Sequence, residues 1–165
     1  MLLTTIGYEG LDVNTFFDIL QQNKIETLVD IRELPLSRKR GFSKSALINN
    51  AEIAGINYVH ISELGAPRNV RHEYRDDEDW QRFSERYKAY LHTQQEPLDQ
   101  LAELVSRCTC CLMCFEADYR KCHRSYVTNA LWVKFDGELQ VNHLGQVRTM
   151  VPVWHSSLAG IPIQR

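Results

Sequence analysis

Short apolar runs alternate with helical stripes along this chain, and that alternation constrains the fold most strongly. Four runs are apolar on both faces of the strands they predict, at residues 2–8, 27–31, 56–61 and 109–115. Strands buried on both faces are typical of parallel sheets covered by helices. A fifth strand is expected at residues 139–144, and an edge strand at 148–154. We therefore predict an α/β fold: one domain over residues 1–165, with a mostly parallel sheet of about five strands flanked by helices in a Rossmann-like three-layer arrangement.

The segments between these runs carry helix signals. Behind Asp12, a capping residue, apolar side chains recur at i, i+3, i+4 and i+7 from Val13 to Leu20. Further helices are predicted at residues 43–55, at 80–91, from 97 to at least 105, and from 119–122 through 131. The charged segment 69–78 is instead expected to be an exposed excursion.

Composition excludes several classes of protein. The net charge of −2 gives no global electrostatic reason to bind nucleic acid or an anionic membrane. No apolar run approaches the length of a membrane span, and the N-terminal residues lack the features of a signal peptide. Five irregularly spaced cysteines fit a reducing compartment better than a disulfide framework. We therefore expect a cytoplasmic protein without a membrane partner.

Polar side chains follow each of the first four predicted strands. Right-handed crossovers bring the carboxyl ends of these strands to one edge of the sheet, where such folds bind ligands. The side chains expected there are Tyr8, Asp30, Arg32, His60, Glu63, Cys114 and Glu116. Asp30 lies inside an apolar run, so it needs a partner, and Arg32 points to the same face. That pair is either a structural ion pair or part of a site.

The segment from Cys114 to Arg124 is the densest in chemistry. If a helix begins near residues 119–122, His123 and Arg124 occupy its first turns, where positive charge opposes the helix dipole. An anion bound at this helix N-terminus would offset that unfavourable interaction. The alternative is that Glu116 or Asp118 provides that negative charge.

The loop after the second strand adds cations and a hydroxyl, at Arg32, Ser37, Arg38, Lys39 and Arg40. A phosphate or a nucleic-acid backbone is a reasonable target for such a loop, if its tip folds toward the same edge. The alternative is an ordinary solvated loop, because charge runs are common on protein surfaces.

Metal is a competing use of the cysteines. Cys108, Cys111 and Cys114 have C-x-x-C-x-x-C spacing, as zinc ribbons do, but here they lie on a predicted strand whose alternate residues face opposite ways. Small buried hydrophobic side chains explain Cys108, Cys110 and Cys111 more simply. The sequence therefore predicts no metal ligands and no cofactor.

Several stretches together resemble one known family. They are TIGYEG from Thr5, LVDIRELPLSR from Leu28, GINYVH from Gly55, ELG from Glu63, CFE from Cys114 and CHR from Cys122. In this order they are similar to the family catalogued as domain of unknown function 488, over about residues 3–135. The resemblance implies an α/β fold and a bacterial-type cytosolic protein, and supplies no activity. The residues that match the family motifs are Tyr8, Asp30, Arg32, Ser37, Arg38, Glu63, Cys114, Glu116, Cys122, His123 and Arg124.

Three functions remain open. The first is an enzyme, a hydrolase or transferase, acting on a nucleotide or on a nucleic-acid phosphate or glycosidic bond. Its catalytic residues would be Asp30, Glu116, Cys122 and His123, with Glu116 or Asp30 as base, His123 in proton transfer and Cys122 as nucleophile. Its substrate-binding residues would be Tyr8, Arg32, Ser37, Arg38, Glu63, Cys114 and Arg124. The second is a non-catalytic nucleic-acid-binding or regulatory module, and the third a cysteine-based structural or redox-sensing domain. Oligomeric state stays open.

Overall fold

The computed structural model describes residues 1–144 and contains one parallel sheet. Its strands are β1 (Leu2–Gly7), β2 (Thr27–Asp30), β3 (Asn57–His60), β4 (Cys110–Cys114) and β5 (Gln140–Leu144). All the strand pairs are parallel, in the order β3-β2-β4-β1-β5. The predicted α/β fold is confirmed, while the strand expected at 148–154 lies outside the described residues.

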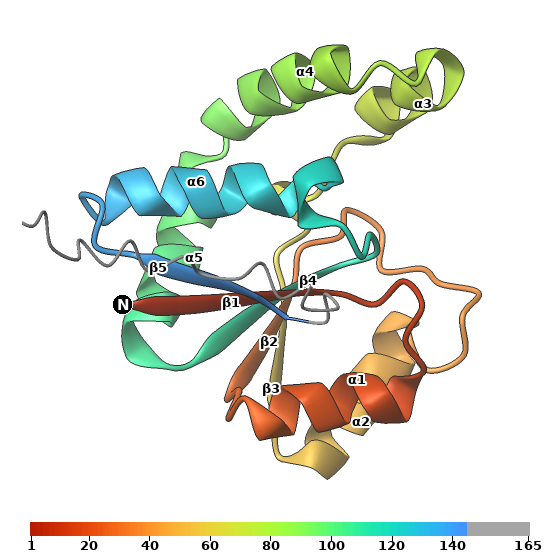
Figure 1. The fold of residues 1–165 in the computed structure, drawn as a ribbon, viewed down its shortest axis with the longest axis vertical. Helices are drawn as coiled ribbons and strands as arrows, with labels where there is room; N and C mark the ends of the chain where they lie inside the picture. The colour runs from red at the N-terminus through yellow and green to blue at the C-terminus, as the bar shows by residue number, and fades with distance from the viewer. Residues whose placement is uncertain (145–165) are drawn as a thin grey trace, which may run out of the picture.

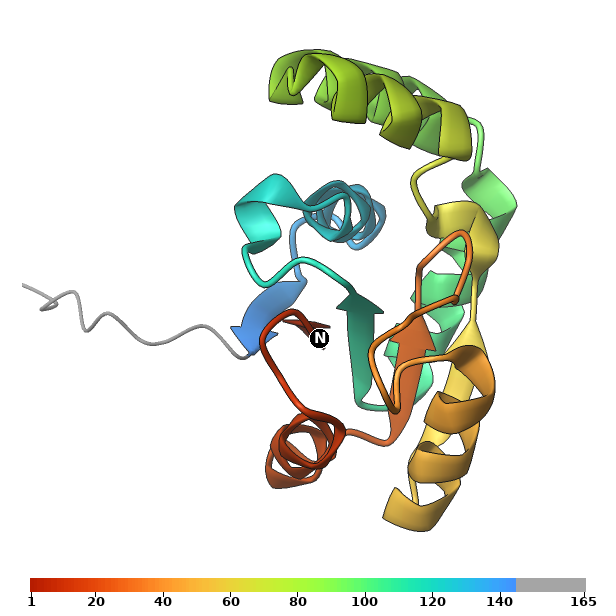
Figure 2. The same cartoon turned by 90° about the vertical axis from the view of Figure 1, so that its right-hand side faces the viewer.

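Helices cover both faces of this sheet (Figure 1). They are α1 (Val13–Gln22), α2 (Lys44–Ala54), α3 (Arg68–Asp77), α4 (Trp80–His92), α5 (Gln95–Arg107) and α6 (Arg124–Lys134). One core joins α1 and α2 to one face of the sheet, around Phe16, Leu28 and Met113. The other joins α4, α5 and α6 to the opposite face, around Tyr87 and Leu112. This is the predicted three-layer arrangement, with α3 and α4 lying outside α6 (Figure 2). None of the helices among residues 1–144 combines the length and the apolar character that crossing a membrane requires.

The prediction of an exposed excursion at residues 69–78 is wrong, because α3 occupies this segment. Val70 is buried, and the ring of Tyr74 packs against Trp80 and Phe83 with centroids 5.7 and 5.3 Å away. These two apolar residues, four apart, are enough to dock an otherwise charged helix onto α4, since one narrow stripe supplies the contact.

Two predicted helix starts also differ from the structure. The segment Tyr119–Lys121 is a 3-10 turn, and α6 begins later, at Arg124. Helix α5 begins at Gln95, so Pro97 lies within its first turn, where its missing N–H costs no hydrogen bond. By contrast, α1 is capped as expected, because Asp12 accepts a hydrogen bond from the Thr15 N–H at 3.0 Å.

The topology opens a crevice beside the central strand. The chain leaves β1 and β2 toward α1 and α2 on one face, and leaves β4 toward α6 on the other (Figure 1). Since β4 lies between β1 and β2, the loops after these strands diverge at the carboxyl edge. Parallel α/β sheets bind ligands at such a switch point.

Candidate active site

A cavity of about 660 Å³ lies at this carboxyl edge. The loops after β1, β2 and β4 form its floor and sides, and α3 and α4 contribute the outer wall. Of the residues expected at the site, the lining includes Tyr8, Arg32, Ser37, Arg38, Cys114, Glu116, Cys122 and His123. Asp30, His60, Glu63 and Arg124 do not line it. Distant segments therefore meet around one cavity, but four of the expected side chains lie elsewhere.

Two thiols, a carboxylate and an imidazole meet on the cavity floor. Cys114 ends β4, and the thiols of Cys114 and Cys122 both donate to Oε2 of Glu116, at 2.9 and 3.1 Å. His123 lies at the N-terminal end of α6 with Nδ1 3.6 Å from the Cys114 sulfur. The ligating atoms of all four residues lie within 4.8 Å of one another. We call these four residues the thiol cluster.

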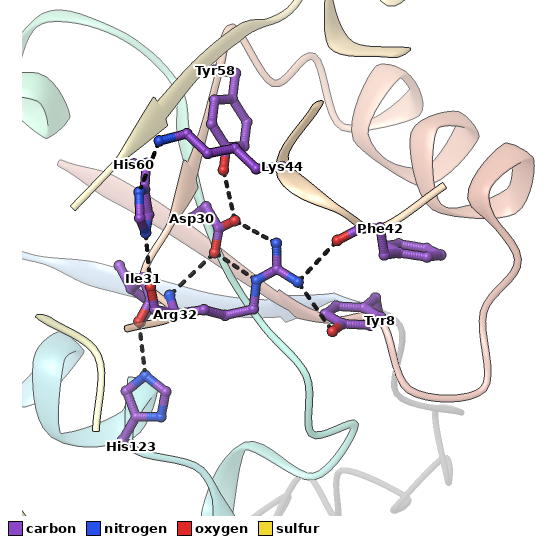
Figure 3. A network of polar contacts seen from close by, with 9 residues as sticks. All are labelled: Tyr8, Asp30, Ile31, Arg32, Phe42, Lys44, Tyr58, His60 and His123. Carbon is purple, nitrogen blue, oxygen red and sulfur yellow. Dashed lines mark hydrogen bonds and ion pairs between the residues drawn. The ribbon is translucent and has the colours of Figure 1, made fainter. Parts of the chain in front are cut away.

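The ring of His123 is held in one orientation. Its Nε2 lies 3.1 Å from the carbonyl oxygen of Ile31, which follows β2 (Figure 3). Because a carbonyl oxygen only accepts, Nε2 carries a proton and Nδ1 is left to face Cys114. Tyr87 packs edge-on against the imidazole, with ring centroids 5.3 Å apart.

Burial and charge act against each other in the thiol cluster. Burial raises the pKa of both thiols, Cys114 and Cys122. Burial also opposes ionisation of Glu116, but the positive charge of His123 and the hydrogen bonds from the thiols hold the pKa of this carboxyl below its ordinary value. Burial opposes protonation of His123, yet Cys122 and Glu116 raise the pKa of the imidazole. The cluster therefore holds two protonated thiols beside a carboxylate that favours its charged form.

Asp30 has the environment of a structural ion pair. Its carboxylate is fully buried and accepts from Arg32 at both oxygens, from Nε at 2.9 Å and from the terminal nitrogen at 2.6 Å (Figure 3). The hydroxyl of Tyr58 donates to it at 2.7 Å, and the Arg32 N–H at 3.1 Å. Four donors occupy the carboxylate, so it has no free lone pair directed at the cavity.

Arg32 extends from this ion pair to the wall of the cavity. Beyond Asp30, its guanidinium donates to the Tyr8 hydroxyl at 3.1 Å and to the Phe42 carbonyl at 3.0 Å (Figure 3). Burial opposes its charge, but the bonds to Asp30 outweigh that and raise the pKa of Arg32. The pKa of Tyr58 is also raised, by burial and by the Asp30 charge. Arg32 is thus a fixed cation that orders the loop after β2.

Arg124 is a second buried cation and lies behind the cavity. It is fully buried and donates to the carbonyl oxygens of Glu116 and, at 3.0 Å, Ala117. It makes no ion pair with any residue in the described part of the chain. Arg124 therefore supports the loop that carries Glu116. Glu63 lies outside the cavity, exposed, and accepts from the Ser62 hydroxyl at 3.0 Å.

The outer wall contains residues that sequence reasoning missed. Arg71, Arg75 and Trp80 line the cavity from α3 and α4. Arg71 and Arg75 were overlooked because residues 69–78 were expected to be an exposed excursion, whereas Trp80 was expected in the helix at 80–91 but not at the site. The spacing of Val70 and Tyr74, four residues apart, was the available signal.

The cations of the lining differ in their partners. Arg71 pairs with Glu33, and Arg32 with Asp30. Arg38, Arg75 and Lys121 make no ion pair with any of residues 1–144. The lining also includes the carboxylates of Glu9, Glu33, Glu116 and Asp118. Free positive charge is thus concentrated at three positions around the mouth.

Comparison with known proteins gives one finding. Searches of curated proteins and of solved structures returned no match. The family model described as "Domain of unknown function DUF488" matches residues 12–131, well over half of the chain. The resemblance drawn from the motifs is thereby confirmed, and the chain belongs to the DUF488 family.

Proposed function

We propose that this protein is an enzyme that acts on a small anionic substrate with a planar ring, most simply a nucleotide. One observation carries the proposal: the thiol cluster lies on the floor of a cavity whose mouth holds Arg38, Arg75 and Lys121 without ion-pair partners among the described residues. Groups that transfer protons and groups that hold an anion thus share one space.

The size and the lining of the cavity support a nucleotide-sized ligand. Its volume of about 660 Å³ falls within the range of small-molecule sites, roughly 300–1,000 Å³. Trp80, Phe83 and Phe115 supply aromatic surface on which a base can stack. Arginine and lysine side chains bind phosphate oxygens through charge-assisted hydrogen bonds. The substrate would place its phosphate at the mouth and its ring against the aromatic wall.

Proton transfer is assigned to Glu116 and His123. The lowered pKa of Glu116 keeps it ready to accept a proton, and the raised pKa of His123 favours a form that donates one. Attack by Cys122 as a nucleophile is disfavoured, since burial raises the pKa of this thiol and the thiolate is the reactive form. We propose a hydrolase or transferase in which Glu116 activates the attacking group. A reducing cytoplasm is the expected compartment.

Ligand titration tests the binding half of the proposal. We expect nucleoside phosphates to bind the purified chain, and Arg38→Ala to weaken the affinity about tenfold, the effect of losing about 1.4 kcal/mol from a charged hydrogen bond. Arg40→Ala is the matched control, because Arg40 is an exposed cation of the same loop and does not line the cavity. Equal affinities for the two variants, or no binding to wild type, would count against the site.

Turnover tests the catalytic half. Glu116→Gln should retain ligand affinity and lose the reaction, because the amide keeps the shape and cannot accept the proton. Binding of single-stranded nucleic acid with a steep salt dependence, and without turnover of any nucleotide, would instead favour the non-catalytic module.

A further inference from the structure

We propose that Cys114, Cys122 and His123 bind one Zn²⁺ ion on the cavity floor, with Glu116 beside the ion as a displaceable fourth ligand. The sequence pattern pointed to a different set, Cys108, Cys111 and Cys114. The fold separates that set, because Cys108 packs against the core on one face of the sheet and Cys111 lies in the core on the other. It brings Cys114 to Cys122 instead, across the loop and the 3-10 turn that precede α6.

The distances are close to those of a tetrahedral zinc site. Zinc bonds of about 2.3 Å to sulfur and 2.0–2.1 Å to nitrogen place tetrahedral ligand atoms about 3.5–3.8 Å apart. Here Cys114 Sγ lies 3.6 Å from His123 Nδ1, and Glu116 Oε2 lies 2.9 and 3.1 Å from the two thiols. All four atoms fall within 4.8 Å of one another. Small side-chain movements are enough to admit an ion.

The second ring nitrogen of His123 is bound as metal ligands require. Zinc-binding histidines donate their other N–H to a carbonyl or carboxylate, which fixes the ring orientation. His123 does so through Nε2 to the Ile31 carbonyl, at 3.1 Å. Cys114 is equally well placed, because it belongs to the central strand β4 and is 3% exposed. Two of the three ligands are therefore preorganised by the sheet.

The surrounding charge also suits a thiolate site. Two thiolates, one carboxylate and Zn²⁺ sum to −1, so a buried positive charge nearby would balance them. Arg124 is fully buried, makes no ion pair with any of residues 1–144, and its positive charge acts on the Cys114 thiol. A buried cation that is hydrogen-bonded only to carbonyl oxygens, without a negative charge beside it, is costly, and an anionic metal cluster would offset that cost.

The site would have an exchangeable position. All four residues line the cavity, so the ion faces the space proposed for substrate. Binding displaces the thiol protons, and any proton on Nδ1, to solvent. With His123 held as a ligand, zinc would act as the Lewis acid, and Glu116 would be left to accept a proton from a bound water. The zinc site goes beyond the proposed function and does not depend on which substrate is used.

Cobalt titration of the chelator-treated chain, residues 1–165, tests the site. We expect Co²⁺ to give the visible bands of a tetrahedral complex and the thiolate charge-transfer absorption of two sulfur ligands, saturating at one ion per chain, with Zn²⁺ displacing it. Cys122→Ser should weaken Co²⁺ affinity by about tenfold or more, with a halved charge-transfer band. Cys108→Ser is the matched control, since Cys108 is a partly exposed cysteine outside the cluster, and it should leave the spectrum unchanged.

The outcomes separate this inference from the proposed function. Absence of tetrahedral bands in the wild-type protein overturns the zinc site, and this result needs no variant to fold. The zinc site is also overturned if Cys122→Ser is folded, as judged by circular dichroism, and still gives the wild-type cobalt absorption spectrum. Zinc binding without nucleotide turnover supports the metal site and contradicts the enzyme. Full nucleotide turnover by metal-free protein supports the enzyme and overturns a zinc ion that acts in catalysis.

Discussion

His123 donates from Nε2 to the carbonyl oxygen of Ile31 at 3.1 Å, and this bond joins the start of α6 to the loop after β2. The two residues are 92 positions apart in sequence. Their contact orients the imidazole, so that Nδ1 faces Cys114. It also ties the basic loop that begins at Arg32 to the thiol cluster. This hydrogen bond therefore links the segment proposed to bind the anion to the segment proposed to carry out catalysis.

Replacing His123 with alanine should therefore affect both stability and the site. The Ile31 carbonyl would be left without this donor, at a cost of about 1–3 kcal/mol in the free energy of unfolding. His92→Ala is the control, because His92 is an exposed residue at the end of α4 and surface changes stay within about 0.5 kcal/mol. Urea unfolding followed by circular dichroism measures both. Equal stabilities for the two variants would show that the bond to Ile31 is unimportant.

Asp30→Asn should destabilise the protein strongly. The change removes the charge that compensates Arg32, which would stay buried without a partner, and such losses amount to about 3–5 kcal/mol. Glu103→Gln provides the comparison, since the Glu103–Arg107 pair is an exposed ion pair within α5 and should contribute no more than about 0.5 kcal/mol. The measurement is again the free energy of unfolding. A small effect of Asp30→Asn would mean that solvent reaches Arg32.

Gly7→Ala should displace the loop that carries Glu116. A Cβ at Gly7 would collide with the carbonyl group of Glu116 and press against Ala117, so the backbone after β4 must move. Gly10→Ala meets no neighbouring atom and bears only the strain of a positive φ, about 1 kcal/mol. We expect Gly7→Ala to lower stability more than Gly10→Ala, and to weaken cobalt binding while Gly10→Ala does not. The reverse order would contradict the close packing of the two strand ends.

Trp80 should report ligand binding by its fluorescence. It lines the cavity from the first residue of α4, whereas Trp132 is a half-exposed residue of α6 away from the lining. A nucleotide base stacked on the aromatic wall should quench Trp80, because the ring would lie in direct contact. Trp80→Phe should abolish the ligand-dependent change, and Trp132→Phe should preserve it. A signal that survives Trp80→Phe would place the ligand elsewhere.

Local sequence signals predicted most of the elements. The runs that became β1, β2 and β4 were recognisable because these parallel strands are buried on both faces and so are mostly apolar, whereas the edge strands β3 and β5 are only partly buried. The N-terminal cap of α1 at Asp12 and the apolar stripe of α4 were also recognisable from residues close together in sequence. The helix α3 was missed, because only Val70 and Tyr74 mark it and their partners, Trp80 and Phe83, belong to the next helix.

The sequence by itself determined that polar groups follow the predicted strands and that the carboxyl ends of these strands lie at one edge of the sheet. Hydrophobic periodicity and the right-handedness of crossovers are local properties, so both could be predicted. Only the tertiary structure decided which of those groups meet. Strand order placed β4 between β1 and β2, directing Cys114 and Glu116 into the cavity while Asp30 and Arg124 became buried supports. The outer wall came from α3, which the sequence did not predict, and from α4, a predicted helix whose place beside the cavity it did not predict. Burial and partner choice depend on contacts between distant segments, and such contacts have no signature in the spacing of neighbouring residues.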